Sequence, residues 1–349
     1  MSAGAARHSV PILFGVLCLA GALIAHIKPS FLFGEILLRF SRNGLLVLSL
    51  LVPILAGLGL NFGIVIGAMA GQIAAILVVY WGGGGILGLG AAWLLATPIA
   101  IVFGLLTGMV FNRAKGREMV SGLIAGFLAN GLYQIVFLFM VGSIIPFHAP
   151  SMVLPQGYGL RNTVDLTAIQ YAMDDLVPLK IPLEGSAVRV PLATLAVIGL
   201  FGLLNVGFLR TKLGQELRAM GQDPHVAAIA GIDVDRNRII ATIFSTVLAA
   251  WGQLLFLQNL GTLNTYNSHE QVGMFSIAAL IVSGATVTRA TVPQAFLGTL
   301  LFHTLFMVSP LAGKAIAGDA QIGEYFRVFV AYAVITAALV LHAWQKKRD

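Results

Sequence analysis

Long apolar segments with very few charged residues recur along the chain, and they restrict it to a fold that is stable in a lipid bilayer. A transmembrane helix needs about 20 apolar residues, and somewhat fewer where glycines or a break shorten it. Ten segments meet this requirement, at 10–27, 44–60, 64–81, 86–110, 120–141, 191–209, 239–260, 273–285, 292–312 and 326–344. We therefore expect an all-α polytopic membrane protein with about ten transmembrane helices, in which segment 273–285 is short for a full crossing.

The composition excludes an ordinary soluble domain. Of the 349 residues, 58% are hydrophobic and 10% are charged, whereas charged residues make up about 25% of a soluble chain. Glycine is abundant at 40 residues, and membrane helices accept it because small residues let neighbouring backbones approach closely. The single cysteine, Cys18, excludes a disulfide within the chain and a cysteine metal cluster. We expect one transmembrane domain over residues 1–349.

The distribution of charge predicts the orientation. With both termini in the cytoplasm, the cytoplasmic segments hold 13 Lys and Arg against 6 acids, and the outer segments hold 8 of each. The formal charge of +7 is then entirely cytoplasmic, as the positive-inside rule requires. Segment 10–27 is alternatively a cleaved signal peptide, but its cleavage pattern is poor and its loss would put the basic C-terminal tail outside. We expect an extracytoplasmic loop at 142–190 and a cytoplasmic loop at 210–238.

Residues 223–231 of the cytoplasmic loop predict a short helix with both ends marked. Asp223 can cap the first free N–H groups, Pro224 suits the first helical position, and Gly231 can adopt the left-handed conformation that ends a helix. The apolar residues that we expect it to expose, without a partner in its own loop, are Val226, Ala227 and Ile229. They either enter a socket in another protein or lie flat against the ends of the membrane helices.

Two stretches resemble one family of membrane proteins. The first is made of Thr211, Leu213, Gly214, Leu217, Arg218, Ala219, Gly221, Ala227, Ala228, Gly231 and Ile232. The second is made of Ile277, Ala278, Ala279, Ile281, Gly284, Gly298 and Thr299. They resemble the branched-chain amino acid and ribose type permeases of ATP-binding-cassette importers, and order, spacing and span count fit over most of the chain. The departures, which concern the subfamily, are Gln215, Ile229, Arg289 and Ala290.

The resemblance implies a type II importer-like permease bundle with several partners. These are a second permease subunit, identical or different, an extracytoplasmic solute-binding protein and cytoplasmic ABC ATPase subunits, in a bacterial inner membrane. Segment 223–231 would be the coupling helix that docks in a groove of the ATPase. The residues to which the resemblance assigns coupling are Arg218, Gly221, Asp223, Pro224, Ala227, Ala228, Gly231 and Ile232.

The chain lacks the motifs of an enzyme. It has no G-x-x-x-x-G-K-[ST] phosphate loop, so ATP and Mg would be used by the partner subunits and no cofactor by this chain. It also lacks G-x-S-x-G, H-E-x-x-H and paired carboxylates within a span, so we expect no catalytic or metal site. His303 lies mid-span and is expected to bridge helices. The basic run at 346–348 has no interleaved aromatic residues, which argues against a nucleic-acid partner.

Neutral amides are the main polar groups expected inside the membrane. No Asp, Glu or Lys lies in the central part of a span, which argues against a secondary carrier coupled to protons or sodium, although main-chain carbonyls can also bind sodium. The amides that we expect to line a translocation pathway are Asn61, Gln72, Asn130 and Gln134, which cluster around the glycine break 57–63 and the fifth span. Each alternatively ties two helices together.

This lining suits an uncharged polar solute. A sugar or a nucleoside fits it better than an amino acid, whose zwitterion usually meets charges or helix ends. A branched-chain amino acid is the alternative substrate. The alternative functions are a carrier or facilitator that works alone and a membrane receptor or scaffold without transport.

Overall fold

The structure is a computed structural model that describes residues 3–183 and 186–346, and it is mainly helical. The helices are α1 (Ala3–Ile24), α2 (Pro29–Leu48), α3 (Leu51–Leu55), α4 (Ile64–Tyr80), α5 (Gly85–Arg113), α6 (Glu118–Ile135), α7 (Leu192–Phe208), α8 (Lys212–Gln222), α9 (Pro224–Ile229), α10 (Val234–Leu260), α11 (Glu270–Val282), α12 (Val292–Ala317) and α13 (Ala320–Lys346). A π-helical turn, Val136–Met140, continues α6, and a 3-10 turn, Thr167–Ile169, lies in the loop that follows.

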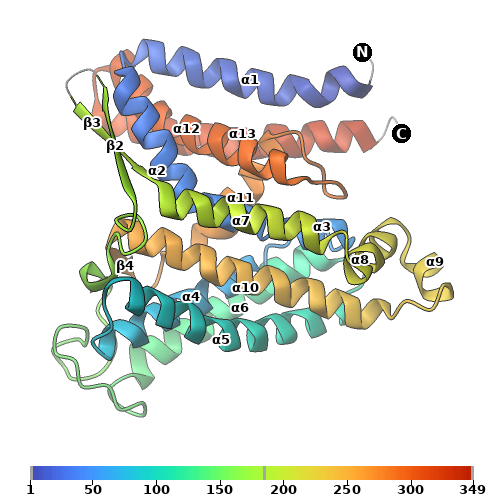
Figure 1. Cartoon of the computed structure of the whole chain (residues 1–349), viewed down its shortest axis with the longest axis horizontal. Coiled ribbons are helices and arrows are strands. Elements are labelled where there is room, and N and C mark those ends of the chain that lie inside the picture. Colours follow the sequence, from blue (N-terminus) through green and yellow to red (C-terminus); the bar gives the residue numbers. More distant parts are fainter. Residues whose placement is uncertain (1–2, 184–185, 347–349) are drawn as a thin grey trace.

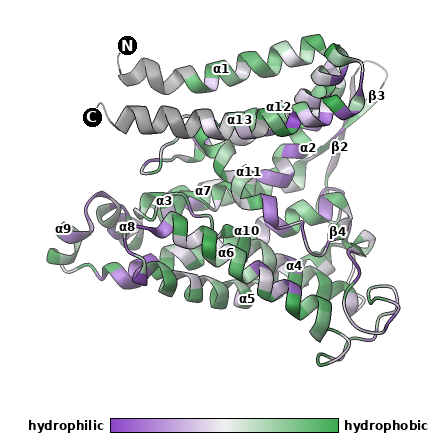
Figure 2. Cartoon of the chain, turned by 180° about the vertical axis from the view of Figure 1, so that it is seen from behind, coloured by the Kyte–Doolittle hydropathy of each residue, from purple (hydrophilic) through white to green (hydrophobic). Residues whose placement is uncertain are grey.

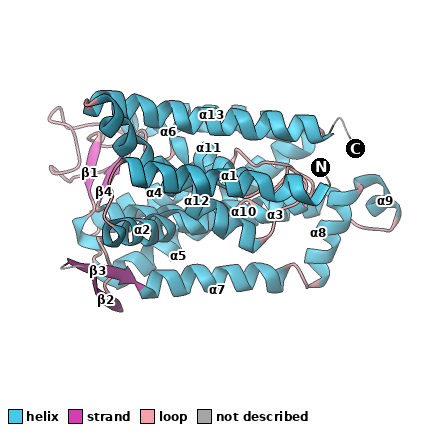
Figure 3. Ribbon diagram, turned by 90° about the horizontal axis from the view of Figure 1, so that it is seen from above, coloured by secondary structure: helices cyan, strands magenta, loops and turns pink. Residues whose placement is uncertain are grey.

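The long helices lie roughly along one axis, with different structures at the two ends (Figure 1). The four strands lie at one end, where β1 (Thr163–Asp165) pairs with β4 (Thr262–Asn264) and β2 (Pro178–Leu183) pairs with β3 (Ser186–Pro191), both antiparallel. Helices α8 and α9 lie at the opposite end, as the view from above also shows (Figure 3). The start of α1 and the end of α13 lie at the same end as α8 and α9 (Figure 1).

Several helices are long and apolar enough to cross a membrane. Five segments of the described chain meet this criterion, namely Pro29–Leu55, Gly85–Arg113, Glu118–Met140, Val234–Leu260 and Val292–Ala317. Counting α7 with α8, which are bent by 74° at the break between them, gives six. Hydrophobic residues follow the long helices, and hydrophilic ones gather at the two ends (Figure 2). These five or six candidate spans confirm the expected multi-pass helical membrane fold. The count of ten crossings stays a prediction.

Helix α2 begins earlier than the hydropathy pattern predicts. The expected second segment starts at residue 44, whereas α2 starts at Pro29, which follows the extended residue Lys28. The charges that lower the hydropathy here are accommodated inside the helix, because Glu35 pairs with Arg39 one turn later at 3.4 Å. Arg39 and Arg42 fall between the expected segments 10–27 and 44–60, which would place them in an outer loop, whereas the structure puts them inside the candidate span Pro29–Leu55.

The glycine break between α3 and α4 is an irregular segment packed against other helices. Gly57 and Gly59 adopt left-handed backbone angles, with φ of +77° and +69°, which residues with side chains rarely adopt. Asn61 is 2% exposed; its Oδ1 accepts from the Gly63 N–H at 2.9 Å and its amide nitrogen donates to Ser245 of α10 at 3.2 Å. Non-helical backbone at membrane depth is tolerated only with such cover.

Helix α10 is the centre of the bundle and packs against α2, α4 and α5. Glycines on α4 allow its close approach, since a Cβ at Gly67 would lie 2.9 Å from the Cβ of Ala249, and one at Gly71 would lie 3.2 Å from the Cβ of Gln253. These distances are shorter than ordinary van der Waals contact, so larger residues would push α4 away from α10. The core therefore depends on small residues where α4 and α10 meet.

Candidate functional site

Helix α8 lies against the irregular segment that follows α3. Thr211 caps it by accepting from the Gly214 N–H at 3.2 Å, and Leu217 and Met220 are buried beside Val52 and Leu58. At the end of α8, a Cβ on Gly221 would lie 2.9 Å from the Gly57 nitrogen. A displacement of α8 would therefore be transmitted directly to the α3–α4 segment.

Helix α9 confirms the short helix predicted from its two ends. The Asp223 carboxylate accepts hydrogen bonds from the N–H groups of His225 at 2.8 Å and Val226 at 3.1 Å. The backbone N–H groups of Val226 and His225 lower the pKa of Asp223 below its usual value, because they stabilise the charged form. Pro224 occupies the first turn, and Gly231 follows with φ of +83°.

Helix α9 lies at the far end of the molecule (Figure 1), and some of its apolar side chains are exposed there. Val226 is 60% exposed, Ile229 is 75% exposed, and Ala228 is also exposed. The expectation that Ala227 is exposed with them was wrong: it is 3% exposed, because it packs in the cluster of Leu217 and Met220. We call the exposed set of Val226, Ala228 and Ile229 the α9 tip. Of the other residues assigned to coupling, Arg218 is exposed and Ile232 is half-buried.

A polar network at the start of α10 joins α8 to two other helices. Asn237 donates to Glu216 of α8 at 3.1 Å. The next residue, Arg238, donates to Glu118 at the start of α6 at 2.5 Å, and to the Asn112 side chain and the Phe111 carbonyl at the end of α5 at 2.9 and 3.0 Å. In the sequence these charges indicate only the orientation of the chain, because nothing in their spacing shows which of them meet.

Two of the four amides expected in a pathway contact a histidine that no sequence pattern indicated, and a third joins them through Asn130. His269, just before α11, lies with Nδ1 2.8 Å from Gln72 Oε1 and with Nε2 2.9 Å from Asn130 Oδ1. Gln134 donates to Asn130 at 3.4 Å, and Asn130 donates to Glu270 at 2.9 Å. Asn61 lies elsewhere, on the α3–α4 segment, and its contacts tie that segment to α10.

The hydrogen bonds around His269 determine where its proton lies. Asn130 uses its oxygen for Gln134 and its nitrogen for Glu270, so its orientation is fixed and the ring donates from Nε2 to its oxygen. A neutral ring then accepts at Nδ1. The Gln72 amide nitrogen has no other partner among the described residues, so a rotated Gln72 amide satisfies both groups. The network joins α4, α6 and α11, and a pathway role for the four amides stays a prediction.

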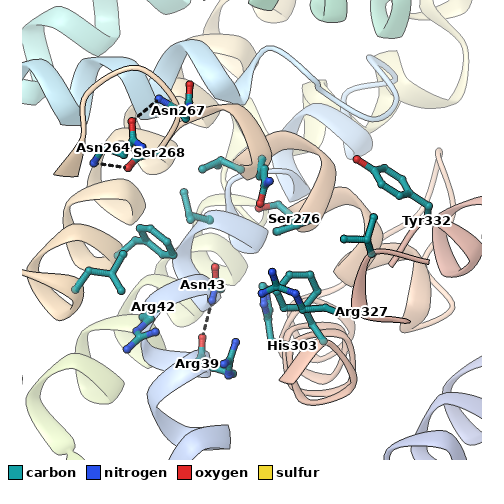
Figure 4. A pocket seen from close by; sticks show the side chains of 18 residues that line it. Arg39, Arg42, Asn43, Asn264, Asn267, Ser268, Ser276, His303, Arg327 and Tyr332 are labelled. Carbon is teal, nitrogen blue, oxygen red and sulfur yellow. Dashed lines mark hydrogen bonds between the residues drawn. The ribbon is translucent and has the colours of Figure 1, made fainter. Parts of the chain in front are cut away.

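A cavity of about 440 Å³ lies beside the loop before α11, which also carries His269, near the end of the molecule that carries the strands. Its wall combines residues of α2, α11, α12 and α13 with the loop before α11, and Figure 4 shows their side chains around it. The labelled polar residues of the wall are Arg39, Arg42, Asn43, Asn264, Asn267, Ser268, Ser276, His303, Arg327 and Tyr332. The hydropathy pattern does not indicate this cavity, because it leaves Arg39 and Arg42 outside the apolar segments.

Comparison with known proteins is consistent with this architecture. A family model described as the permease component of branched-chain amino acid transport systems matches residues 32–339. The chain is 23% identical over 261 residues to the nucleoside ABC transporter permease protein NupB of Lactococcus lactis, covering 71% of this chain and 63% of the relative. It is 24% identical over 194 residues to the fructose import permease protein FruG of Bifidobacterium longum, covering 54% and 50%.

A third relative is matched over more of its length. The chain is 23% identical over 342 residues to the autoinducer 2 import system permease protein LsrC of an Enterobacter species, covering 96% of this chain and 86% of the relative. The matched region spans less than two thirds of the first two relatives. No solved structure matches the chain. Because the family match extends over most of the sequence, this chain belongs to the branched-chain amino acid transport system permease family.

Proposed function

We propose that this chain is the transmembrane subunit of an ABC importer and forms the translocation pathway for a small polar solute. The α9 tip is the observation that carries the proposal. A helix of six residues is marginal alone, yet this one is capped at Asp223, seated through Ala227 and directed beyond the bundle with Val226 and Ile229 exposed. That geometry suits insertion into a groove of a partner.

The proposed partners follow from the family and from the ends of the molecule. ABC ATPase subunits would bind at α8 and α9, and they would use ATP and Mg. An extracytoplasmic solute-binding protein would dock at the end with the strands, and a second permease subunit would complete a homodimer or heterodimer. This chain would act as a single permease domain over 1–349, with its extracytoplasmic loop at 142–190 and its coupling region at 210–238.

We also propose ten crossings of a bacterial inner membrane, with both termini in the cytoplasm. The five long apolar helices and the bent α7–α8 pair support six of them. The shorter apolar helices Val10–Ile24, Ile64–Tyr80 and Glu270–Val282, together with α13, would supply the rest. The orientation is supported by the charge balance and by the position of the start of α1, of α9 and of the end of α13 at one end of the molecule (Figure 1).

A sugar or a nucleoside is the proposed class of solute. The relatives are named as permeases for nucleosides, fructose and autoinducer 2. The family description names branched-chain amino acids, which are the alternative. A carrier that works alone is not favoured, because these relatives are ABC transporter or import-system permeases.

Affinity purification of the tagged full chain from membranes of its own host tests the proposal. We expect an ABC ATPase to co-purify, and its ATP hydrolysis in nanodiscs to rise when the cognate binding protein is added with its solute. Solute uptake by proteoliposomes that contain this chain alone would contradict the proposal and support the carrier.

A further inference from the structure

The cavity between α2, α11, α12 and α13 has a cationic wall. Three arginines line it, Arg39 and Arg42 from α2 and Arg327 from α13 (Figure 4). None of the described residues that line it is Asp or Glu. A hollow that carries charges of one sign inside low-dielectric walls concentrates the field and attracts ions of the opposite sign.

The carboxylates that pair with two of these arginines lie outside the cavity wall. Glu35 lies 3.4 Å from Arg39, and Glu324 lies 2.6 Å from Arg327, yet neither carboxylate lines the cavity. These pairs hold each guanidinium in place and use only part of its five N–H donors. Arg39 and Arg327 themselves line the cavity, so the N–H donors that these pairs leave unused are available to a group bound there.

Arg42 is held through a relay. Its Nε donates to the Asn259 oxygen, and the Asn259 nitrogen donates to Asp174 at 2.5 Å. Asp174 is 2% exposed and also accepts from Gln258 at 3.1 Å and Thr194 at 2.5 Å. The Asp174 carboxylate is thus bonded to neutral donors, and among the described residues no carboxylate pairs with the Arg42 guanidinium directly.

Arginine side chains within a membrane span cost free energy, so their presence there indicates a function. Arg39 and Arg42 lie inside a candidate membrane span, where arginine is costly and usually marks a substrate or ion pathway. Arg327 also lies 4.8 Å from the centre of the Phe306 ring, which holds the cation on an apolar surface.

The remaining polar wall suits hydroxyl groups. Asn264, Asn267, Ser268 and Gln271 line the side formed by the loop before α11 and by its first turn. The volume of about 440 Å³ is within the range of small-molecule sites, which is roughly 300–1,000 Å³. A monosaccharide-sized solute fits this space.

We propose that this cavity receives the transported solute and that the solute carries a carboxylate or a phosphate on a hydroxylated body. The arginines bind the anionic group, and the amides and Ser268 bind the hydroxyls. This inference rests on the proposed function and replaces the uncharged sugar or nucleoside with an acidic derivative of one.

Matched pairs of probes test the inference on the full-chain complex in nanodiscs of zwitterionic lipid. The pairs are glucuronate with glucose, and ribose 5-phosphate with ribose, with binding measured by equilibrium dialysis of radiolabelled probe. We expect at least one anion to bind roughly tenfold or more tightly than its neutral partner, because hydrogen bonds between charged groups are worth that much. Arg327→Gln should abolish the preference, and Arg39→Lys, which retains the charge, should reduce it.

Arg189→Gln is the matched control, because Arg189 is exposed on the β2–β3 hairpin and pairs with Asp175 at 2.9 Å. It should leave the preference unchanged. Equal binding of the two members of each pair, no binding of either anion, or an unaltered preference in Arg327→Gln overturns the inference. In a second preparation with phosphatidylglycerol added to the nanodiscs, displacement of the bound anion by this lipid, with the lipid itself protecting the Arg327 region, assigns the cavity to lipid and also overturns the inference.

The same preparation separates this inference from the proposed function. If an ATPase co-purifies but the anionic and neutral probes bind equally well, only the inference is contradicted. A preparation without an ATPase contradicts the proposed function, whichever probes bind.

Discussion

The guanidinium of Arg238 lies 2.5 Å from the carboxylate of Glu118, and both side chains are almost fully buried, at 8% and 11% exposure. This pair joins the first turns of α10 to the start of α6. Through Asn237 and Glu216 it also connects with α8. A movement imposed on α8 by a partner would therefore reach α10 and α6 through hydrogen bonds between charged and polar groups.

Removing one member of this pair should destabilise the fold. Arg238→Gln leaves Glu118 buried without its partner, and such changes typically cost about 3–5 kcal/mol. Thermal unfolding of the purified chain should show a markedly lower Tm. Lys115→Gln is the control, because the Lys115–Asp235 pair is 56% exposed on both sides and exposed pairs contribute under about 1 kcal/mol. Equal Tm values for the two variants would refute this view of the network.

The α9 tip should be needed for ATPase binding. Ala228→Arg and Ile229→Asp place charges on exposed positions, so the fold should persist while the ATPase no longer co-purifies. Ala227→Arg is a poorer test, because Ala227 is buried. Ile144→Asp, at a 72% exposed residue of the outer loop, makes the same change far from α9 and should retain the ATPase. An ATPase bound normally to Ile229→Asp would exclude the tip as the contact.

The close approach at Gly221 should tolerate no side chain. Gly221→Ala would place a Cβ 2.9 Å from the Gly57 nitrogen, and overpacking of this kind costs typically 1–3 kcal/mol. We expect a lower Tm and reduced stimulation of ATP hydrolysis by the binding protein. Gly199→Ala in α7 is the control, because no atom lies within 4 Å of its new Cβ. A Gly221→Ala variant as stable and active as Gly199→Ala would contradict the proposed contact between α8 and the α3–α4 segment.

The cap at Asp223 should control the order of α9. Asp223→Ala removes the acceptor for the His225 and Val226 N–H groups, whereas Asn is about as good a cap as Asp. Hydrogen exchange at 224–229 should be faster in Asp223→Ala and near normal in Asp223→Asn.

The pH dependence of this cap has a defined sign. The folded pKa of Asp223 is lowered, so its contribution is present above the unfolded pKa and is lost as pH falls through the folded one. Around neutral pH the cap should be fully present. Protection of α9 in the parent chain that varied between pH 6 and 8, relative to Asp223→Asn at each pH, would contradict this assignment.

Reaction with thiol reagents can decide the role of the intramembrane amides. In a Cys18→Ala background, Asn130→Cys and Gln134→Cys should react with a membrane-impermeant methanethiosulfonate if water and solute reach them. Leu128→Cys is the control on the same helix, because Leu128 is 65% exposed and would face lipid. Labelling at 130 or 134 but not at 128 would support a pathway, and no labelling at any of the three would leave the amides as ties between helices.

Local signals in the sequence predicted the elements that depend on neighbouring residues. Asp223, Pro224 and Gly231 define α9 because a cap and a left-handed stop act within a few residues. Hydropathy failed at α2, where Glu35 and Arg39 lower the average although they neutralise each other one turn apart. The pairing of β1 with β4 and the contact of His269 with Gln72 join residues far apart in sequence, and no local pattern indicates such partners.

Because α11 is short, it places only a short apolar stretch beneath the arginine-lined cavity. The cavity wall follows α11 from Gln271 to Ser276, and below it the side chains of 277–282 are all apolar and buried. At 1.5 Å per residue this apolar stretch is about 9 Å long, against about 30 Å for the hydrocarbon core of a bilayer. If the cavity holds the solute, as proposed, α11 covers it on this face with under two turns of apolar helix.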